Sequence, residues 1–280
     1  MDPSGPDYSP PRDPLRRTAA PAEEGWGTTC LWLPVNLVQA VSLGVVCGTL
    51  IPGALVAQKF SGNARIAFWM ARKIWAPIII GGGLSRLAVS GRENVSPGQP
   101  TLVVSNHQSY ADIPALYGAL PVPLRFTARI ELRALPFIGR FMRSLGMVLI
   151  DRSSPRRAAR AVVELGQALQ RGEWTVIFPE GTRSVDGALG PFAAGSLAAA
   201  IAAKVDILPV AITGSGRMLP KGGFRVRPSR IHVRIGQPIS TRGLQPGDRF
   251  ALAAQVRDAV GKLLAGAVAD SSSTLDGSTG

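Results

Sequence analysis

Cysteine and histidine are both scarce in this chain of 280 residues, which contains two of each. Cys30 and Cys47 lie in one apolar stretch and provide neither a disulfide framework nor the spacing of zinc ligands. The two histidines are His107 and His232, and the chain has no carboxylate cluster, so we expect neither a metal site nor another cofactor. A mechanism that requires a base at neutral pH therefore has two candidates.

The chain also lacks two common functional loops. No Gly-x-Ser-x-Gly sequence is present, which excludes a serine nucleophile on that type of strand-to-helix turn. The segment Gly214-Ser215-Gly216 with Lys221 superficially resembles a phosphate-binding loop, but Gly222 follows the lysine and the spacing is wrong.

Acidic residues are outnumbered: 31 Lys and Arg stand against 18 Asp and Glu, and the formal net charge is +13. This balance favours an anionic partner, either a nucleic acid, an acidic membrane surface or a phosphorylated substrate. A nucleic-acid-binding surface needs exposed aromatic residues among the basic ones, and the chain has three tyrosines. The non-enzyme alternative that the net charge leaves open is a basic membrane- or nucleic-acid-binding protein. We interpret the central basic residues as a cationic rim for anionic groups: Arg125, Arg129, Arg133, Arg140 and Arg143.

The N-terminal part divides into a polar tail and two apolar segments. Residues 1–24 are rich in Pro, Asp, Arg and Ser, so we expect them to be disordered. Residues 25–58 carry no charge and are long enough for a helix in a bilayer. Pro34 and the Pro52-Gly53 pair predict either a helix between them or a helix with a bent end. A second apolar segment covers residues 66–84. Because basic residues flank the first segment on both sides, we expect residues 25–86 to form a membrane-seated helical hairpin that dips into one leaflet. Two full spans, or two core helices of a soluble domain, are the alternatives.

Residues 87–268 have the pattern of an α/β domain. Buried strands are predicted over residues 101–104, 174–178 and 207–212, and a half-exposed strand over 231–235. Helices are predicted over 155–171, 193–203 and 248–264, the first capped by Ser154 and the last by Asp248. This alternation implies a mixed, largely parallel sheet flanked by helices. We expect residues 269–280 to be a disordered tail.

The segment Asn106-His107-Gln108-Ser109-Tyr110-Ala111-Asp112 follows the first strand and runs into a helix start. A turn there would let the Asp112 carboxylate fold back onto one imidazole nitrogen of His107. That contact would fix the tautomer and leave the other nitrogen free to accept a proton. A histidine at a strand end is more often structural than catalytic, so this motif is weak by itself.

A second polar segment, Phe178-Pro179-Glu180-Gly181-Thr182-Arg183-Ser184, follows the 174–178 strand. Gly181 permits close approach of the backbone to an anion, and the Arg183 guanidinium suits phosphate oxygens. Thr182 and Ser184 add hydroxyl donors. The alternative is a generic turn, for which this string is unusual.

Together these two segments resemble the signature of the glycerolipid acyltransferases, specifically the bacterial 1-acylglycerol-3-phosphate (lysophosphatidic acid) acyltransferases. Supporting blocks occur in the family's order: residues 126–132, Pro136-Phe137-Ile138-Gly139, Ile150-Asp151-Arg152 and Leu208-Pro209-Val210. The resemblance covers residues 87–238, over half of the chain.

The resemblance implies that His107 takes the proton from the sn-2 hydroxyl of 1-acylglycerol 3-phosphate while Asp112 orients it. The hydroxyl oxygen would attack the thioester of acyl-CoA or acyl-carrier protein, giving phosphatidic acid at the cytoplasmic face of the cell membrane. The positions that match those binding the glycerol phosphate are Glu180, Gly181, Thr182 and Arg183. Arg129 stands where the family usually has a lysine.

Two departures from the family's pattern concern lysines. Ile130 stands where a second lysine is common, and Phe192-Ala193-Ala194-Gly195 replaces Phe-Lys-x-Gly. Because both changes remove a cation, the identity of the acyl acceptor stays open. The alternatives are glycerol 3-phosphate, a lyso-ornithine lipid or another lysolipid. An inactive membrane-binding relative is a further alternative, against which the intact His107 and Asp112 argue.

Overall fold

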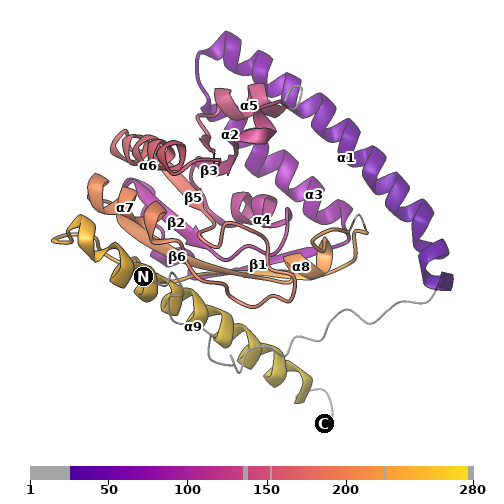
Figure 1. The fold of residues 1–280 in the computed structure, drawn as a ribbon. Coiled ribbons are helices and arrows are strands. Elements are labelled where there is room, and N and C mark those ends of the chain that lie inside the picture. The colour runs from indigo at the N-terminus through magenta and orange to yellow at the C-terminus, as the bar shows by residue number, and fades with distance from the viewer. Residues whose placement is uncertain (1–25, 135–137, 152, 224, 277–280) are drawn as a thin grey trace, which may run out of the picture.

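A computed structural model of the chain describes residues 26–134, 138–151, 153–223 and 225–276. A seven-stranded sheet forms its centre (Figure 1). The strands are β1 (Arg86–Ser90), β2 (Thr101–Ser105), β3 (Leu124–Arg129), β4 (Val148–Ile150), β5 (Trp174–Ile177), β6 (Asp206–Thr213) and β7 (Arg230–Ile235). Their order is β1-β7-β6-β2-β5-β3-β4, and every neighbouring pair is parallel except β6 and β7. The predicted mixed, largely parallel sheet is confirmed.

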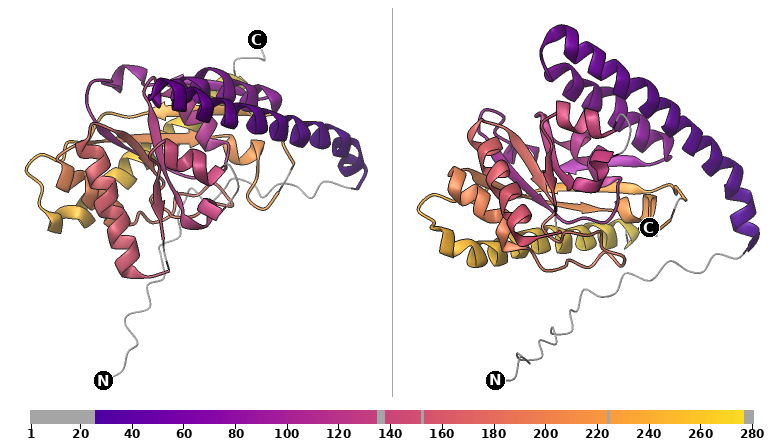
Figure 2. Two further views of the ribbon diagram at one scale, coloured as in Figure 1. Left: turned by 90° about the horizontal axis from the view of Figure 1, so that it is seen from above. Right: turned by 45° about the horizontal axis from the view of Figure 1, so that its top comes forward.

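Helices cover both faces of this sheet, as the views of Figure 2 also show. One face is covered by α4 (Asp112–Ala119) and by a helical run of α2 (Arg65–Met70), a π-helical turn (Ala71–Trp75) and α3 (Ala76–Gly82). The other face is covered by α6 (Pro155–Gln170), α7 (Ala194–Ala203) and α9 (Arg249–Asp276). Smaller elements are α5 (Ile138–Ser144), α8 (Ser215–Met218) and the 3-10 turns Arg92–Asn94, Ile130–Ala134 and Pro246–Asp248.

The central strands β2 and β5 are buried along their whole length. Both are rich in β-branched and apolar residues, which is typical of parallel strands covered on two faces. β6 lies on the other side of β2 and runs parallel to it. The segments that follow β2, β5 and β6 therefore leave the sheet at the same edge, and this edge holds both predicted motifs.

The N-terminal hairpin is present, with two differences from expectation. α1 (Trp26–Ser61) is one helix of 36 residues that continues through Pro34 and Pro52. Each proline removes one backbone hydrogen bond of the helix, and α1 continues past both positions. The returning arm, α2 to α3, is partly core: Ala67 and Ala76 are buried. α1 lies alongside it (Figures 1 and 2) and between residues 36 and 61 is long and apolar enough to cross a membrane, with 6% of its most apolar stretch buried.

The C-terminal helix α9 runs to Asp276, past its expected end at residue 264 and into the segment expected to be disordered from residue 269. No glycine or proline lies between Gly266 and Gly277, so the backbone has no local stop signal there. Asp248 caps the preceding 3-10 turn rather than α9, since its carboxylate accepts from the Gln245 amide at 2.7 Å. The expected disorder of residues 1–24 falls outside the described residues.

Candidate active site

The Asn106 side chain connects the segment after β2 to the neighbouring strand β6 by hydrogen bonds. Its side-chain amide donates to the Ile212 carbonyl (2.9 Å), and its side-chain carbonyl accepts from the Ile212 amide (2.8 Å). Asn106 is itself buried. This two-way pairing fixes the direction in which the chain leaves the sheet, one residue before His107.

His107 and Asp112 are in contact, as their spacing predicts. Nδ1 of His107 lies 2.7 Å from Oδ2 of Asp112. The same oxygen accepts from the backbone amides of Gln108 (2.8 Å) and Ser109 (3.0 Å). Asp112 is fully buried at the first position of α4, where the helix dipole favours a negative charge. An ionised Asp112 only accepts hydrogen bonds, so the contact places the imidazole hydrogen on Nδ1.

The opposite nitrogen, Nε2 of His107, is the free end of the ring. It makes no hydrogen bond within the described part of the chain, and the side chain is 15% exposed. Phe178 stacks on the ring, with the centroids 4.0 Å apart and the planes at 15°. The ring is held at one edge and one face and still presents an accessible proton acceptor.

Glu180 joins the two polar segments through its carboxylate. Oε1 accepts from the His107 backbone amide (2.8 Å), and Oε2 accepts from the Gly190 amide (2.9 Å). Burial raises the pKa of Glu180, and these two amide hydrogen bonds oppose that rise by favouring the carboxylate. Both oxygens already have backbone donors, so the geometry favours a positioning role for Glu180 over direct contact with a substrate.

The turn after Glu180 brings Arg183 beside the His107 segment. Gly181 has a φ of +72°, a conformation that favours glycine. The Ser184 amide donates to the His107 carbonyl at 2.7 Å, so backbone bonds tie the two segments together. The Arg183 guanidinium lies 4.0 Å from the centroid of the exposed Tyr110 ring, a cation–π contact that supports its extended side chain. Thr182 is exposed on the same turn.

Arg129 ends β3 at the same edge of the sheet, but the structure does not bring it into this cluster. Its guanidinium lies 3.2 Å from Glu131, and both side chains are well exposed. Among the described residues no bond connects Arg129 to His107 or to the Arg183 turn. A role for Arg129 therefore requires an extended substrate or a movement of its side chain.

Comparison with known proteins connects this geometry to a family. A family model described as Acyltransferase matches residues 86–213. The 1-acyl-sn-glycerol-3-phosphate acyltransferase of Pseudomonas aeruginosa is 35% identical over 206 residues, which cover 72% of this chain and 77% of that enzyme. This chain belongs to the 1-acyl-sn-glycerol-3-phosphate acyltransferase family.

The fold of this acyltransferase is also that of a solved relative. The crystal structure of the 1-acyl-sn-glycerophosphate acyltransferase PlsC from Thermotoga maritima matches with a TM-score of 0.71 and 27% identity, over 83% of this chain and 94% of that one. The chloroplastic 1-acyl-sn-glycerol-3-phosphate acyltransferase BAT2 of Brassica napus is 33% identical, and the match spans 59% of its length.

The cluster around His107 and Arg183 contains further residues that were not among the candidate site residues predicted from the sequence. Tyr110 supports Arg183, and Phe178 stacks on His107. Lys221 reaches the turn from the segment after α8, where Nζ donates to Thr182 Oγ1 (3.1 Å) and to the Arg183 carbonyl (2.8 Å). Tyr110 and Phe178 lie inside the two polar segments, so their position in the sequence could have indicated that they lie near the site. The sequence singled out Lys221 only in a segment with the wrong spacing for a phosphate-binding loop. Its contacts with the turn join residues 38 and 39 positions apart, and spacing along the chain does not predict them.

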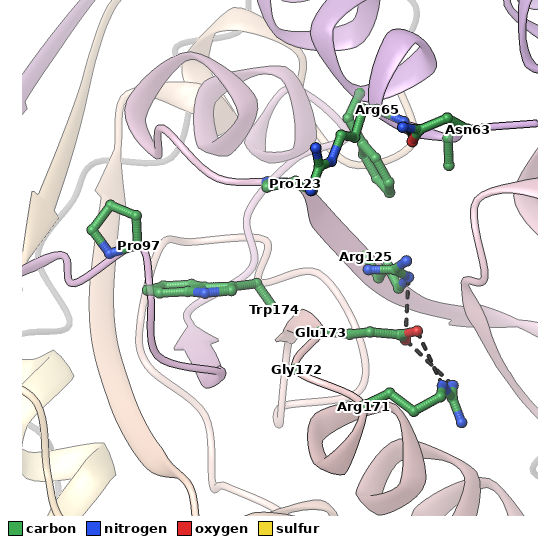
Figure 3. A pocket seen from close by; sticks show the side chains of 11 residues that line it. Asn63, Arg65, Pro97, Pro123, Arg125, Arg171, Gly172, Glu173 and Trp174 are labelled. Atoms are coloured by element: carbon green, nitrogen blue, oxygen red, sulfur yellow. Dashed lines mark hydrogen bonds and ion pairs between the residues drawn. The ribbon is translucent and has the colours of Figure 1, made fainter. Parts of the chain in front are cut away.

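A pocket of about 360 Å³ lies at the opposite edge of the sheet, where β3 and β5 begin (Figure 3). Arg125 lies there, 3.2 Å from Glu173, and its guanidinium sits over the Phe68 ring. Glu173 also pairs with Arg171 at 3.1 Å. Burial lowers the pKa of Arg125, and Glu173 opposes that shift. Arg125 was interpreted as part of the cationic rim, and this is corrected: its side chain pairs with Glu173 at the opposite edge of the sheet from His107.

Proposed function

We propose that the protein transfers a fatty acyl group from acyl-CoA or acyl-carrier protein to the sn-2 hydroxyl of 1-acylglycerol 3-phosphate, giving phosphatidic acid. The observation that carries this proposal is the His107–Asp112 pair, whose accessible Nε2 lies in a segment bonded to the Arg183 turn. A proton acceptor and a cation suited to phosphate thus stand on one edge of the sheet, in a member of this family.

His107 acts as the general base in this proposal. Nε2 accepts the proton of the acceptor hydroxyl while Nδ1 donates to Asp112, which stabilises the imidazolium that forms. The hydroxyl oxygen attacks the thioester carbonyl carbon, the new ester C–O bond forms, and the C–S bond breaks. The departing thiolate takes the proton from the imidazolium. The step uses no covalent enzyme intermediate and no metal.

The phosphate of the acceptor is assigned to the turn after β5. Arg183 offers a planar pair of donors, and Gly181 and Thr182 offer a close backbone approach and a hydroxyl. Glu180 positions this turn against His107, because its carboxylate accepts from the backbone amides of His107 and Gly190. Arg129, on the neighbouring strand end, is the more distant cation. Ile130 and Ala193 supply none.

α1 is the proposed membrane seat, at the cytoplasmic face of the cell membrane, and residues 25–86 and 87–268 are the proposed hairpin and catalytic domains. Exposed apolar side chains on α1 support this assignment: Leu37, Val38, Val41, Val45 and Val56. The net charge of +13 supports attraction to an anionic membrane surface and to anionic donors. The acceptor is itself a lipid, so seating the enzyme in the membrane brings it to its substrate.

An acyl-transfer assay with the full-length protein in detergent tests the function. Acyl-CoA and acyl-carrier protein are each offered with 1-acylglycerol 3-phosphate, glycerol 3-phosphate, a lyso-ornithine lipid and a phosphate-free lysolipid. We expect transfer to 1-acylglycerol 3-phosphate to be the fastest. Faster transfer to another acceptor would replace the proposed substrate. Absence of transfer to every acceptor, with protein bound to vesicles or nucleic acid, would support the non-enzyme alternative.

A further inference from the structure

Lys221 contacts the turn that carries Arg183, although it lies in a different part of the chain. It follows α8, in the glycine-containing segment whose spacing does not fit a phosphate-binding loop. Its Nζ donates to Thr182 Oγ1 at 3.1 Å and to the Arg183 carbonyl at 2.8 Å. An ammonium group has three donors, so one N–H of Lys221 remains for another acceptor.

The backbone that carries Lys221 is fixed against the His107 segment. The fully buried Ser109 hydroxyl donates to the Leu219 carbonyl at 2.7 Å, two residues before Lys221. Gly216 packs so closely on Gln108 that an added Cβ would lie 3.3 Å from the Gln108 side chain. The segments after β2, β5 and β6 therefore meet. Lys221, in the segment after β6, contacts the turn after β5.

Two cations, Arg183 and Lys221, meet at this junction. Lys221 donates to the backbone carbonyl of Arg183, whose own side chain is a cation. The Arg183 guanidinium contacts the Tyr110 ring and not a carboxylate. Within the described residues no salt bridge joins Lys221 or Arg183 to a carboxylate, and the nearby Glu180 is occupied by two backbone amides. Two cations that meet at one turn without a carboxylate partner are a suitable arrangement for a doubly charged phosphate.

Position 193 lies beside the same turn, since the Ala193 amide donates to the Pro179 carbonyl at 3.0 Å. A lysine is expected there from the family's pattern and alanine is present. We propose that Lys221 supplies the second cation of the acceptor-phosphate site, positioned by the Thr182 hydroxyl and the Arg183 carbonyl. This inference rests on the proposed function, and it assigns the phosphate headgroup of the acceptor to Arg183 and Lys221 together.

Lys221→Gln and Lys221→Arg separate a charge requirement from support of the turn. Glutamine keeps an N–H donor for the Arg183 carbonyl but has no charge, whereas arginine keeps the charge. The matched control is Arg217→Gln, which removes one exposed cation from the same segment, and the Arg217 side chain has no bond to the turn in the described part of the chain. KM and kcat for 1-acylglycerol 3-phosphate are measured at saturating donor, together with inhibition by glycerol 3-phosphate.

We expect Lys221→Gln to raise KM and the inhibition constant of glycerol 3-phosphate about 10- to 30-fold, the effect of losing one charged hydrogen bond, with kcat changed less than about threefold. Lys221→Arg should stay within about threefold of the wild type, since the charge is retained, and Arg217→Gln should match the wild type.

An unchanged KM in Lys221→Gln would overturn the inference while the wild-type activity leaves the proposed function standing. Equal defects in the glutamine and arginine variants, or a fall in kcat alone, would also overturn it, because the lysine would then support the turn without binding phosphate. A wild-type protein that transfers nothing to 1-acylglycerol 3-phosphate would refute the proposed function itself, and this inference with it.

Discussion

Asp112→Asn tests how the buried carboxylate serves His107. Oδ2 of Asp112 accepts three hydrogen bonds, from His107 Nδ1 and from the Gln108 and Ser109 amides. The asparagine oxygen can take this position and accept all three. In the reversed orientation the asparagine NH2 would face the Gln108 and Ser109 N–H groups, and donors would then stand against donors. The structure therefore predicts that the variant keeps the imidazole hydrogen on Nδ1 and loses only the negative charge.

The rate effect follows from that lost charge. Two unit charges about 4 Å apart interact by about 4 kcal/mol at an effective dielectric constant of roughly 20. Each 1.36 kcal/mol is about tenfold in rate, so kcat should fall by about 10²- to 10³-fold when the imidazolium loses its partner.

The assay combines kinetics with ¹⁵N NMR of histidine-labelled protein. The chain has two histidines, so His232→Ala leaves His107 as the single histidine signal. We expect an unchanged tautomer and a reduced kcat in Asp112→Asn. Asp258→Asn is the control, since that carboxylate pairs with Lys262 on the exposed side of α9 and should have no effect on rate. A kcat within threefold of the wild type, or a His107 ring with its hydrogen moved to Nε2, would refute the reasoning.

Three further predictions concern Glu180, Arg183 and α1. Burial raises the pKa of Glu180, so the ionised carboxylate costs folding free energy that is recovered as pH falls through the raised pKa. The unfolding temperature of the wild type relative to Glu180→Gln should therefore rise as the pH is lowered from 7 toward 4.5, the ordinary pKa of glutamate, and a constant difference would contradict this. Arg183→Ala should raise KM for 1-acylglycerol 3-phosphate about 10- to 100-fold, with partial rescue by lysine because the paired donors are lost; an unchanged KM would remove Arg183 from the phosphate site. A chain that begins at Gly62, without α1, should stay in solution after detergent removal while the full chain does not. Full-length protein that stays soluble would exclude α1 as the membrane seat.

Local patterns in the sequence predict those elements that depend on near neighbours. The apolar runs of β2, β5 and β6, and the Ser154–Pro155 start of α6, were predicted from residues inside the elements themselves. The 106–112 segment also encodes its own contact, because Asp112 lies on the turn that follows His107. β1, β3 and β4 were not predicted: the five residues of β1 and the six of β3 mix polar and apolar side chains, and β4 is an apolar strand of only three residues.

Long-range contacts explain the remaining differences. Glu180 was assigned to substrate binding by its motif, and its carboxylate lies against the His107 amide 73 residues away. Arg125 and Arg129 belong to the same strand, yet one points into the pocket of Figure 3 and the other is exposed at the opposite end. The position of Lys221 depends on three segments meeting at one sheet edge. None of these placements follows from spacing along the chain.

The central claim is that His107 is the general base, and acyl transfer by His107→Ala tests it most directly. The variant is compared with the wild type and with His232→Ala, whose histidine lies in β7. Since positioned general-base catalysis contributes about 10²- to 10⁴-fold, His107→Ala should lose at least that much of kcat while still binding glycerol 3-phosphate. His232→Ala should retain wild-type turnover. A folded His107→Ala protein that transfers the acyl group at close to the wild-type rate would contradict the mechanism.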